Sequence, residues 1–217
     1  AGIVLATVFT FSCSSDDGKD DDGGGGGKVT TFTDNRDNKT YKSVVIGTQT
    51  WMAENLNYEV GGKCYGEDGQ TYDDNVEDYV TLSSSEIQAN CVTYGRLYNL
   101  ETARLVCPTG WHLPSEAEWT ALTDYVGSNA GTKLKSATGW SSGNGTDNYG
   151  FSALPSGFGN SDGYFEGVGI VGYWWSSTTE NDSGLAWSWV MDYEYSDVGK
   201  RNYDKSRLFS VRCVEDN

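Results

Sequence analysis

Four cysteines between residues 64 and 213 restrict how this chain can fold. Cys64, Cys91, Cys107 and Cys213 lie in the aromatic-rich part of the chain, and a fifth cysteine, Cys13, lies apart near the N-terminus. Four cysteines allow three sets of pairings. A metal site is not expected, because no Cys-x-x-Cys sequence occurs and a single histidine cannot complete a zinc-binding set. Disulfides formed outside the cytoplasm explain the cysteines better.

The sequence around the cysteines favours one set of pairings. The segment 59–92 is acidic and loop-like in composition, and a Cys64–Cys91 disulfide would close it. A Cys107–Cys213 disulfide would join the last predicted strand to the middle of the chain. In the chain-entropy model, a disulfide that closes a loop of that length stabilises the fold by roughly 4–5 kcal/mol. We therefore expect both disulfides.

The composition indicates an acidic domain built from short strands and long loops. The 217 residues suffice for one domain and a tail, and they include 28 glycines, 3 prolines and 13% aromatic residues. Aromatic residues favour strands, and the scarcity of long helical patterns points the same way. The formal net charge is -16, which repels phosphate backbones, so nucleic acid is not an expected partner.

The N-terminal residues indicate export and anchoring. Residues 1–13 form an apolar run that is too short to span a bilayer and ends in Cys13, similar to the signal of a bacterial lipoprotein in which the cysteine is acylated. A buried strand cysteine is the alternative interpretation. Residues 14–27 combine acids with polyglycine and predict a flexible tether. We expect a lipid-anchored outer-membrane protein that displays residues 28–217 at the cell surface.

Apolar periodicity predicts two helices. The first covers 94–106, and the second covers 115–127, with Ser115 and Glu118 forming a capping box and Gly127 ending the helix. The predicted strands are a hairpin within 41–52 and the segments 172–179, 186–193 and 207–214. In the segment 186–193, strand alternation places four side chains on one face: Trp187, Trp189, Met191 and Tyr193.

Residues 110–119 contain the only histidine of the chain, His112. Histidine titrates near neutral pH and can act as a general base. No serine or cysteine nucleophile signature accompanies it, so we expect a structural hydrogen-bonding role and no catalytic residue. Trp111 and Trp119 are expected in the core.

Six motifs occur in the order seen in the Fibrobacter succinogenes major paralogous domain, and the chain resembles that family over roughly residues 30–215. They are Trp51–Leu56, Tyr94–Asn99, Cys107–Pro114, Gly150–Pro155, Trp174–Ser177 and Phe209–Cys213. That family is similar to formylglycine-generating enzymes and, more distantly, to C-type lectins. The resemblance implies an α+β, C-type-lectin-like domain with two helices, small antiparallel sheets, long loops and bracing disulfides.

The segment 158–208 resembles the region that diversity-generating retroelements vary in similar lipoproteins. Its Asn, Tyr, Asp and Ser residues suit an adaptable contact surface. We therefore expect ligand binding through the C-terminal loops, with a glycan or a surface protein of another cell, a phage or a host as the partner. The residues expected to contact the ligand are Tyr173, Asn181, Asp182, Leu185, Ser188, Trp189, Asp192, Glu194, Tyr203, Asp204 and Arg207.

An enzyme and a structural component are the two alternative classes of function. Enzymes of the formylglycine-generating type need two late cysteines to bind copper, and Cys213 is the only late cysteine here, so an enzyme is not expected. A structural cell-envelope or fibre component is the third class. Glu180, Asn181, Asp182 and Asp192 carry oxygen atoms of the kind that calcium prefers. The Glu-Pro-Asn and Trp-Asn-Asp sequences of calcium-dependent sugar sites are absent, so solvated polar loops are favoured and no cofactor is expected.

Overall fold

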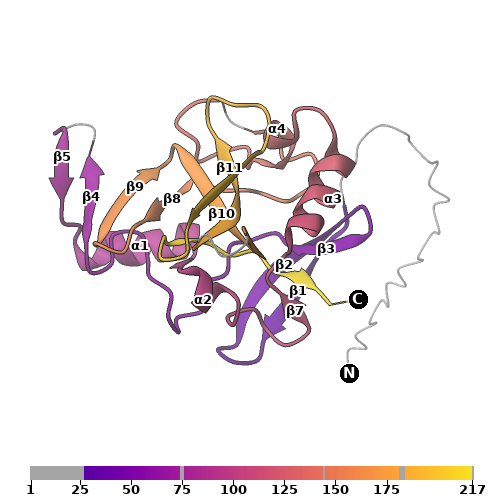
Figure 1. Cartoon of the computed structure of the whole chain (residues 1–217), viewed down its shortest axis with the longest axis horizontal. Coiled ribbons are helices and arrows are strands. Elements are labelled where there is room, and N and C mark those ends of the chain that lie inside the picture. The colour runs from indigo at the N-terminus through magenta and orange to yellow at the C-terminus, as the bar shows by residue number, and fades with distance from the viewer. Residues whose placement is uncertain (1–26, 74–75, 144, 181–183, 217) are drawn as a thin grey trace, which may run out of the picture.

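A computed structural model describes residues 27–73, 76–143, 145–180 and 184–216, which form two β-sheets with helices beside them (Figure 1). The predicted signal 1–13 and residues 14–26 of the tether lie outside the described residues. The described helices are α1 (Ser84–Tyr94), α2 (Leu100–Ala103), α3 (Glu116–Val126) and α4 (Ala130–Leu134). The described strands are β1 (Val29–Asp34), β2 (Lys39–Ile46), β3 (Gln49–Met52), β4 (Gln70–Asp73), β5 (Asp78–Val80), β6 (Leu97–Tyr98), β7 (Trp111–His112), β8 (Ser156–Gly159), β9 (Tyr164–Val168), β10 (Val171–Thr179), β11 (Leu185–Asp192), β12 (Gly199–Asp204), β13 (Phe209–Ser210) and β14 (Val214–Glu215). No described helix is long and apolar enough to cross a membrane.

The five-stranded sheet brings the end of the chain beside the first hairpin. Its strand order is β1-β2-β3-β14-β7, and the hairpin predicted within 41–52 is confirmed as β2 and β3. Gly47 in the turn has a φ of 64°, a conformation that favours glycine. Val214 pairs with Trp51 on one side and with His112 on the other. The sheet thereby joins three distant parts of the sequence.

The nine-stranded sheet is larger than expected and mixed in direction. Its main strand order is β12-β11-β10-β8-β9-β4-β5, with β13 and β6 joined beside β10, and β10 runs parallel to both β8 and β13. The strands predicted at 172–179 and 186–193 are confirmed as β10 and β11. The single strand predicted at 207–214 is wrong, because β13 pairs in this sheet whereas β14 pairs in the other.

Helix α3 confirms the helix predicted over 115–127. Ser115 caps it, accepting a hydrogen bond from the Glu118 amide, and the Glu118 carboxylate accepts one from the Ser115 amide at 2.7 Å. Gly127 follows the last turn. Its buried face consists of Trp119, Leu122 and Val126.

The helix predicted over 94–106 is confirmed only at Leu100–Ala103, as α2, and the described residues contain four helices instead of two. Leu97 and Tyr98 form β6 and pair with β13, and the short α2 begins only after them. Helix α1 lies in the segment expected to be loop. Cys91 is its only buried residue, so it lacks the apolar periodicity by which a packed helix is recognised.

Tryptophan rings connect α3 to both sheets. Trp119 stacks on Trp189 of β11 with ring centroids 5.6 Å apart, and it contacts Trp51 of β3 at 4.7 Å. Trp119 is therefore in the core, as predicted. Trp111 is only half-buried and stacks on Phe32 at 4.3 Å, so the core position expected for Trp111 is wrong.

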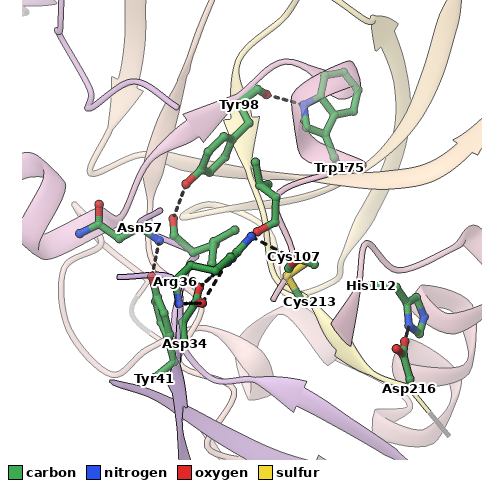
Figure 2. Close-up of a disulfide and its surroundings, with 12 residues drawn as sticks. Asp34, Arg36, Tyr41, Asn57, Tyr98, Cys107, His112, Trp175, Cys213 and Asp216 are labelled. Atoms are coloured by element: carbon green, nitrogen blue, oxygen red, sulfur yellow. Dashed lines mark hydrogen bonds and ion pairs between the residues drawn. A yellow bond between two sulfur atoms is a disulfide. The ribbon is translucent and has the colours of Figure 1, made fainter. Parts of the chain in front are cut away.

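Both predicted disulfides, Cys64–Cys91 and Cys107–Cys213, are present. Beside the second, Arg36 donates hydrogen bonds to Asp34 at 2.6 Å and to the carbonyl of Val106 at 2.7 Å (Figure 2). Burial raises the pKa of the Asp34 carboxyl, but the hydrogen bonds from Arg36 outweigh it, so this pKa lies below its ordinary value. The ion pair holds Arg36 in place, and its hydrogen bonds to the carbonyls of Val106 and Cys107 fasten the β1–β2 turn to the chain next to the disulfide.

Candidate functional site

The residues predicted to contact a ligand divide by position in the nine-stranded sheet. Four line two adjoining hollows: Tyr173, Asp192, Tyr203 and Arg207. Three are half-buried or exposed but line neither hollow: Leu185, Glu194 and Asp204. Two lie outside the described residues: Asn181 and Asp182. The remaining two are buried: Ser188 and Trp189.

The predictions for Ser188 and Trp189 are wrong, because neither side chain reaches the surface. Trp189 is 3% exposed and packs on Trp119, and Ser188 is 0% exposed in the strand between β10 and β12. Alternation along a strand separates two faces but does not say which of them is covered. Both faces of β11 are covered at these two positions.

Two tyrosines separate the hollows. Tyr173 comes from β10 and Tyr203 from β12, and their rings lie 5.4 Å apart at 90°. The Tyr203 hydroxyl donates to the Tyr173 hydroxyl at 3.5 Å, and Phe209 stacks on Tyr173 at 4.8 Å. Burial raises the pKa of Tyr173, so this hydroxyl keeps its proton at neutral pH. The pair therefore offers aromatic surface together with a protonated hydroxyl.

The first hollow, here called the Asp192 hollow, has a volume of about 280 Å³. Apolar side chains such as Val171 and Val190 line it together with both tyrosines. Its charged residues are of both signs: Asp192, Asp197 and Arg201. Such a mixture suits a polar ligand with an apolar face rather than a strongly charged one.

The second hollow, here called the Arg207 hollow, has a volume of about 240 Å³. It shares Tyr173 and Tyr203 with the Asp192 hollow and adds the ring of Phe158. The Arg207 guanidinium lies 5.7 Å from the centre of that ring, and Glu166 supplies a carboxylate. The two hollows thus form one composite site on either side of the tyrosine pair.

Sequence reasoning missed two residues that shape this site. The buried Lys135 donates from Nζ to the carbonyls of Asp192 at 2.9 Å and Tyr195 at 3.0 Å, which fixes the turn beside the Asp192 hollow. Burial lowers the pKa of Lys135. At Gly199, an added Cβ would lie 2.8 Å from a Val190 methyl carbon, so glycine keeps that hollow open. The sequence around Lys135 is polar and Gly-rich and gives no signal that this lysine is buried.

His112 belongs to the five-stranded sheet, lines neither hollow and is held between two carboxylates. Its Nδ1 is 2.6 Å from Asp216 (Figure 2), and its Nε2 is 2.7 Å from Glu118. Burial lowers the pKa of His112, but the two carboxylates outweigh it and the pKa lies above its ordinary value. The arrangement ties the C-terminus to α3. No group of three His, Cys, Asp or Glu side chains in the described part of the chain could hold a metal ion.

Fold and disulfides together define a mixed, sheet-rich domain with four described helices and two internal cross-links. The family model of the Fibrobacter succinogenes major domain matches residues 44–215, so the chain belongs to that family, as its motifs predicted. No curated protein and no solved structure matches the chain.

Proposed function

We propose that this protein is a ligand-binding module displayed on a bacterial cell surface, and that it recognises its ligand without chemistry. The observation that carries the proposal is the composite site, where two hollows of about 280 and 240 Å³ meet at Tyr173 and Tyr203. A tyrosine offers a flat apolar ring and a polar tip, which suits the apolar face and hydroxyl rim of a sugar ring. A glycan is therefore the favoured ligand over a surface protein.

A C-type-lectin-like fold is part of the proposal. It is supported by the close approach of β3, β7 and β14 and by the long disulfide-closed segment between Cys107 and Cys213. In such a fold, a rigid framework carries variable loops. Two residues act as framework for the composite site in this sense. Lys135 holds the Asp192 carbonyl, and Phe209 stacks on Tyr173.

Lipid anchoring through Cys13 in the outer membrane is also proposed, with residues 14–27 as the tether. The apolar run before Cys13 and the acids after it support this. Incorporation of labelled palmitate into the wild type but not into Cys13→Ala is the expected result. Equal labelling of both proteins would refute the anchor.

Variation of residues 158–208 by a retroelement is the third element of the proposal. Every residue that lines either hollow lies in this segment, except Phe209. Sequencing the same locus in clonal isolates tests it. Changes concentrated at hollow residues are expected, whereas drift spread evenly over the chain would refute the retroelement.

An oxidase of the formylglycine-generating type is not proposed. Such chemistry uses free thiols, and the Cys213 sulfur is bonded to Cys107. Copper titration of the purified domain, with thiols counted in parallel, checks this. Copper binding accompanied by free thiols would reverse the conclusion.

The test of ligand binding is an array of glycans and cell-surface proteins. The wild type is expected to bind, and Tyr203→Ala is expected to lose about tenfold in affinity, since an aromatic contact is worth on the order of 1 kcal/mol. Tyr125→Ala is the matched control, because Tyr125 is an exposed tyrosine on α3. Equal loss in both variants, or full binding by Tyr203→Ala, would refute the proposal.

A further inference from the structure

One face of the nine-stranded sheet extends from the composite site toward the β4–β5 hairpin, which projects from the end of the molecule (Figure 1). Phe158 and Tyr173 are in ring contact at 5.4 Å, so they lie on the same side of the sheet. Phe158 of β8 pairs directly with Glu166 of β9, and directly paired residues share a face. The face of the Arg207 hollow therefore reaches β9.

The strand register carries this face onto the hairpin. Side chains two residues apart in a strand share a face, so Tyr164 lies on the face of Glu166. Tyr164 pairs with Gln70 of β4, which puts Tyr72 on the same face. Tyr72 in turn pairs with Tyr79 of β5. Three tyrosines outside the hollows thus share the face of the composite site.

These three side chains, Tyr72, Tyr79 and Tyr164, are here called the tyrosine row. The ring centroids of Tyr72 and Tyr79 are 5.3 Å apart, and those of Tyr79 and Tyr164 are 4.8 Å apart. Tyr72 and Tyr164 are 42% and 39% exposed, so much of their ring surface is not used in the core. The Tyr79 hydroxyl donates to Glu166 at 2.5 Å, and Glu166 lines the Arg207 hollow. The row is therefore continuous with the composite site.

We propose that the tyrosine row and the composite site form one elongated binding surface for a linear, uncharged polysaccharide. This rests on the proposed function and extends it. With neighbouring strands about 4.8 Å apart, the five steps from β12 to β4 span on the order of 24 Å, which is far longer than one sugar ring. Successive rings along an extended chain would each find an aromatic side chain.

The charges on this face select an uncharged polymer. The row and the hollows hold the carboxylates of Glu166, Asp192 and Asp197 but only two arginines, Arg201 and Arg207. The whole chain has a formal net charge of -16. A polyanionic glycan would be repelled by this field, whereas hydroxyl groups can bond to carboxylates and tyrosine hydroxyls.

Native affinity electrophoresis tests the proposal with three uncharged linear polymers as probes: xylan, glucomannan and mixed-linkage β-glucan. The wild type is expected to be retarded by at least one of them. Affinity is then measured for short and long oligosaccharides cut from that polymer. The long fragment is expected to bind about tenfold more tightly than the disaccharide, because only the long fragment reaches the tyrosine row.

Variants separate this inference from the proposed function. Tyr72→Ala is expected to lose about tenfold in affinity for the long fragment and to keep its affinity for the disaccharide, because Tyr72 is 42% exposed and lines neither hollow. Tyr203→Ala is expected to weaken both, and Tyr125→Ala neither. Thermal unfolding confirms that each variant is folded, and Tyr72→Ser is the second hairpin variant if Tyr72→Ala is unfolded.

Two results would overturn the elongated surface while leaving the composite site intact: equal affinity for short and long fragments, or an unchanged length dependence in the folded hairpin variant. Absence of retardation in all three polymers would also overturn it. Full binding by Tyr203→Ala would instead refute the proposed function itself. Binding to a protein on the array but to no glycan would replace the polysaccharide with a protein partner.

Discussion

Asn55 lies at the centre of a buried polar network that joins five of the six family motifs. Its side-chain oxygen accepts hydrogen bonds from Trp174 Nε1 and Arg212 Nε, each at 2.9 Å. Its side-chain nitrogen donates to the Tyr94 carbonyl at 2.9 Å and to Ser210 at 3.3 Å. All polar groups of the amide are thereby used, and a buried group of this kind is costly to leave unpaired.

Arg212 is fully buried in this network and has no carboxylate partner among the described residues. It donates to the carbonyls of Phe151 and Ser152, and its guanidinium lies 4.3 Å from the centre of the Phe151 ring. Burial lowers its pKa to about 9, so it remains charged at neutral pH. Asn55 and the two carbonyls therefore replace a counter-ion.

Replacement of Asn55 by alanine is expected to lower the free energy of unfolding by about 2–4 kcal/mol, because it leaves Arg212 and Trp174 without an acceptor. Urea unfolding followed by tryptophan fluorescence measures the change. Asn148→Ala, at an exposed asparagine, is expected to stay within about 0.5 kcal/mol of the wild type. Similar losses in both variants would contradict the role of the network.

His112 gives the stability a predictable pH dependence. Its pKa is raised above the ordinary 6.5 in the folded state, so its stabilising contribution is complete below pH 6.5 and is lost as the pH rises through the folded pKa. His112→Asn should therefore differ most from the wild type on the acidic side. Because the side chain is 39% exposed, the difference is at most about 1 kcal/mol.

Unfolding titrations of the wild type and His112→Asn at pH 5.5 and pH 9 check this. The gap in stability is expected to shrink toward pH 9, and a gap that widens would contradict the ion pairs to Glu118 and Asp216. His112→Ala is also expected to change stability more than ligand binding. The reverse result would reopen a catalytic role for this residue.

Among the elements, those with both a pattern and a boundary signal could be predicted from sequence. Helix α3 has a capping box, an apolar stripe and a terminal glycine, and the β2–β3 hairpin has its glycine turn. Helix α1 has a capping box but only one buried side chain, so apolar periodicity could not reveal it. Residues 97–98 carry apolar side chains at helical spacing but pair with β13, a contact set by the tertiary fold.

The composite site was predictable only in part, because composition does not show which side chains the tertiary fold covers. Tyr173, Asp192, Tyr203 and Arg207 were found because their composition suits a contact surface. Ser188 and Trp189 are residue types of the same kind, but they lie in a central strand whose two faces are both packed. The tyrosine row was not predictable, because the pairing of β4 with β9 joins segments about ninety residues apart.

The capping box of α3 should be separable from the packing of that helix. Ser115→Ala is expected to cost about 1 kcal/mol, because the Glu118 amide loses its acceptor. Ser128→Ala, at an exposed serine just after the helix, should be nearly neutral. Thermal unfolding of the two variants compares them, and a neutral Ser115→Ala would contradict the capping role.

For the whole molecule, the two disulfides should contribute unequally. Cys107–Cys213 joins residues 106 apart and Cys64–Cys91 joins residues 27 apart. In the chain-entropy model they stabilise the fold by about 4.8 and about 3.6 kcal/mol, respectively. Denaturant unfolding of the Cys107→Ser/Cys213→Ser and Cys64→Ser/Cys91→Ser variants tests the order, and a larger loss in the second variant would contradict it.

The six motifs and the composite site have different places in the molecule as a whole. The motifs supply Asn55, Trp174, Arg212 and the Cys107–Cys213 bond, all of which are buried in or beside the core. Apart from Phe209, the hollows are built from residues between those motifs. This separation lets the binding surface change while the framework stays fixed.

Amide hydrogen exchange with and without the ligand identified on the array measures whether the binding surface is separate from the framework. New protection is expected in β10 and β12 around residues 171–173 and 199–203, and none at His112 or in α3. Protection centred on residues 110–119, with the hollows unchanged, would contradict it.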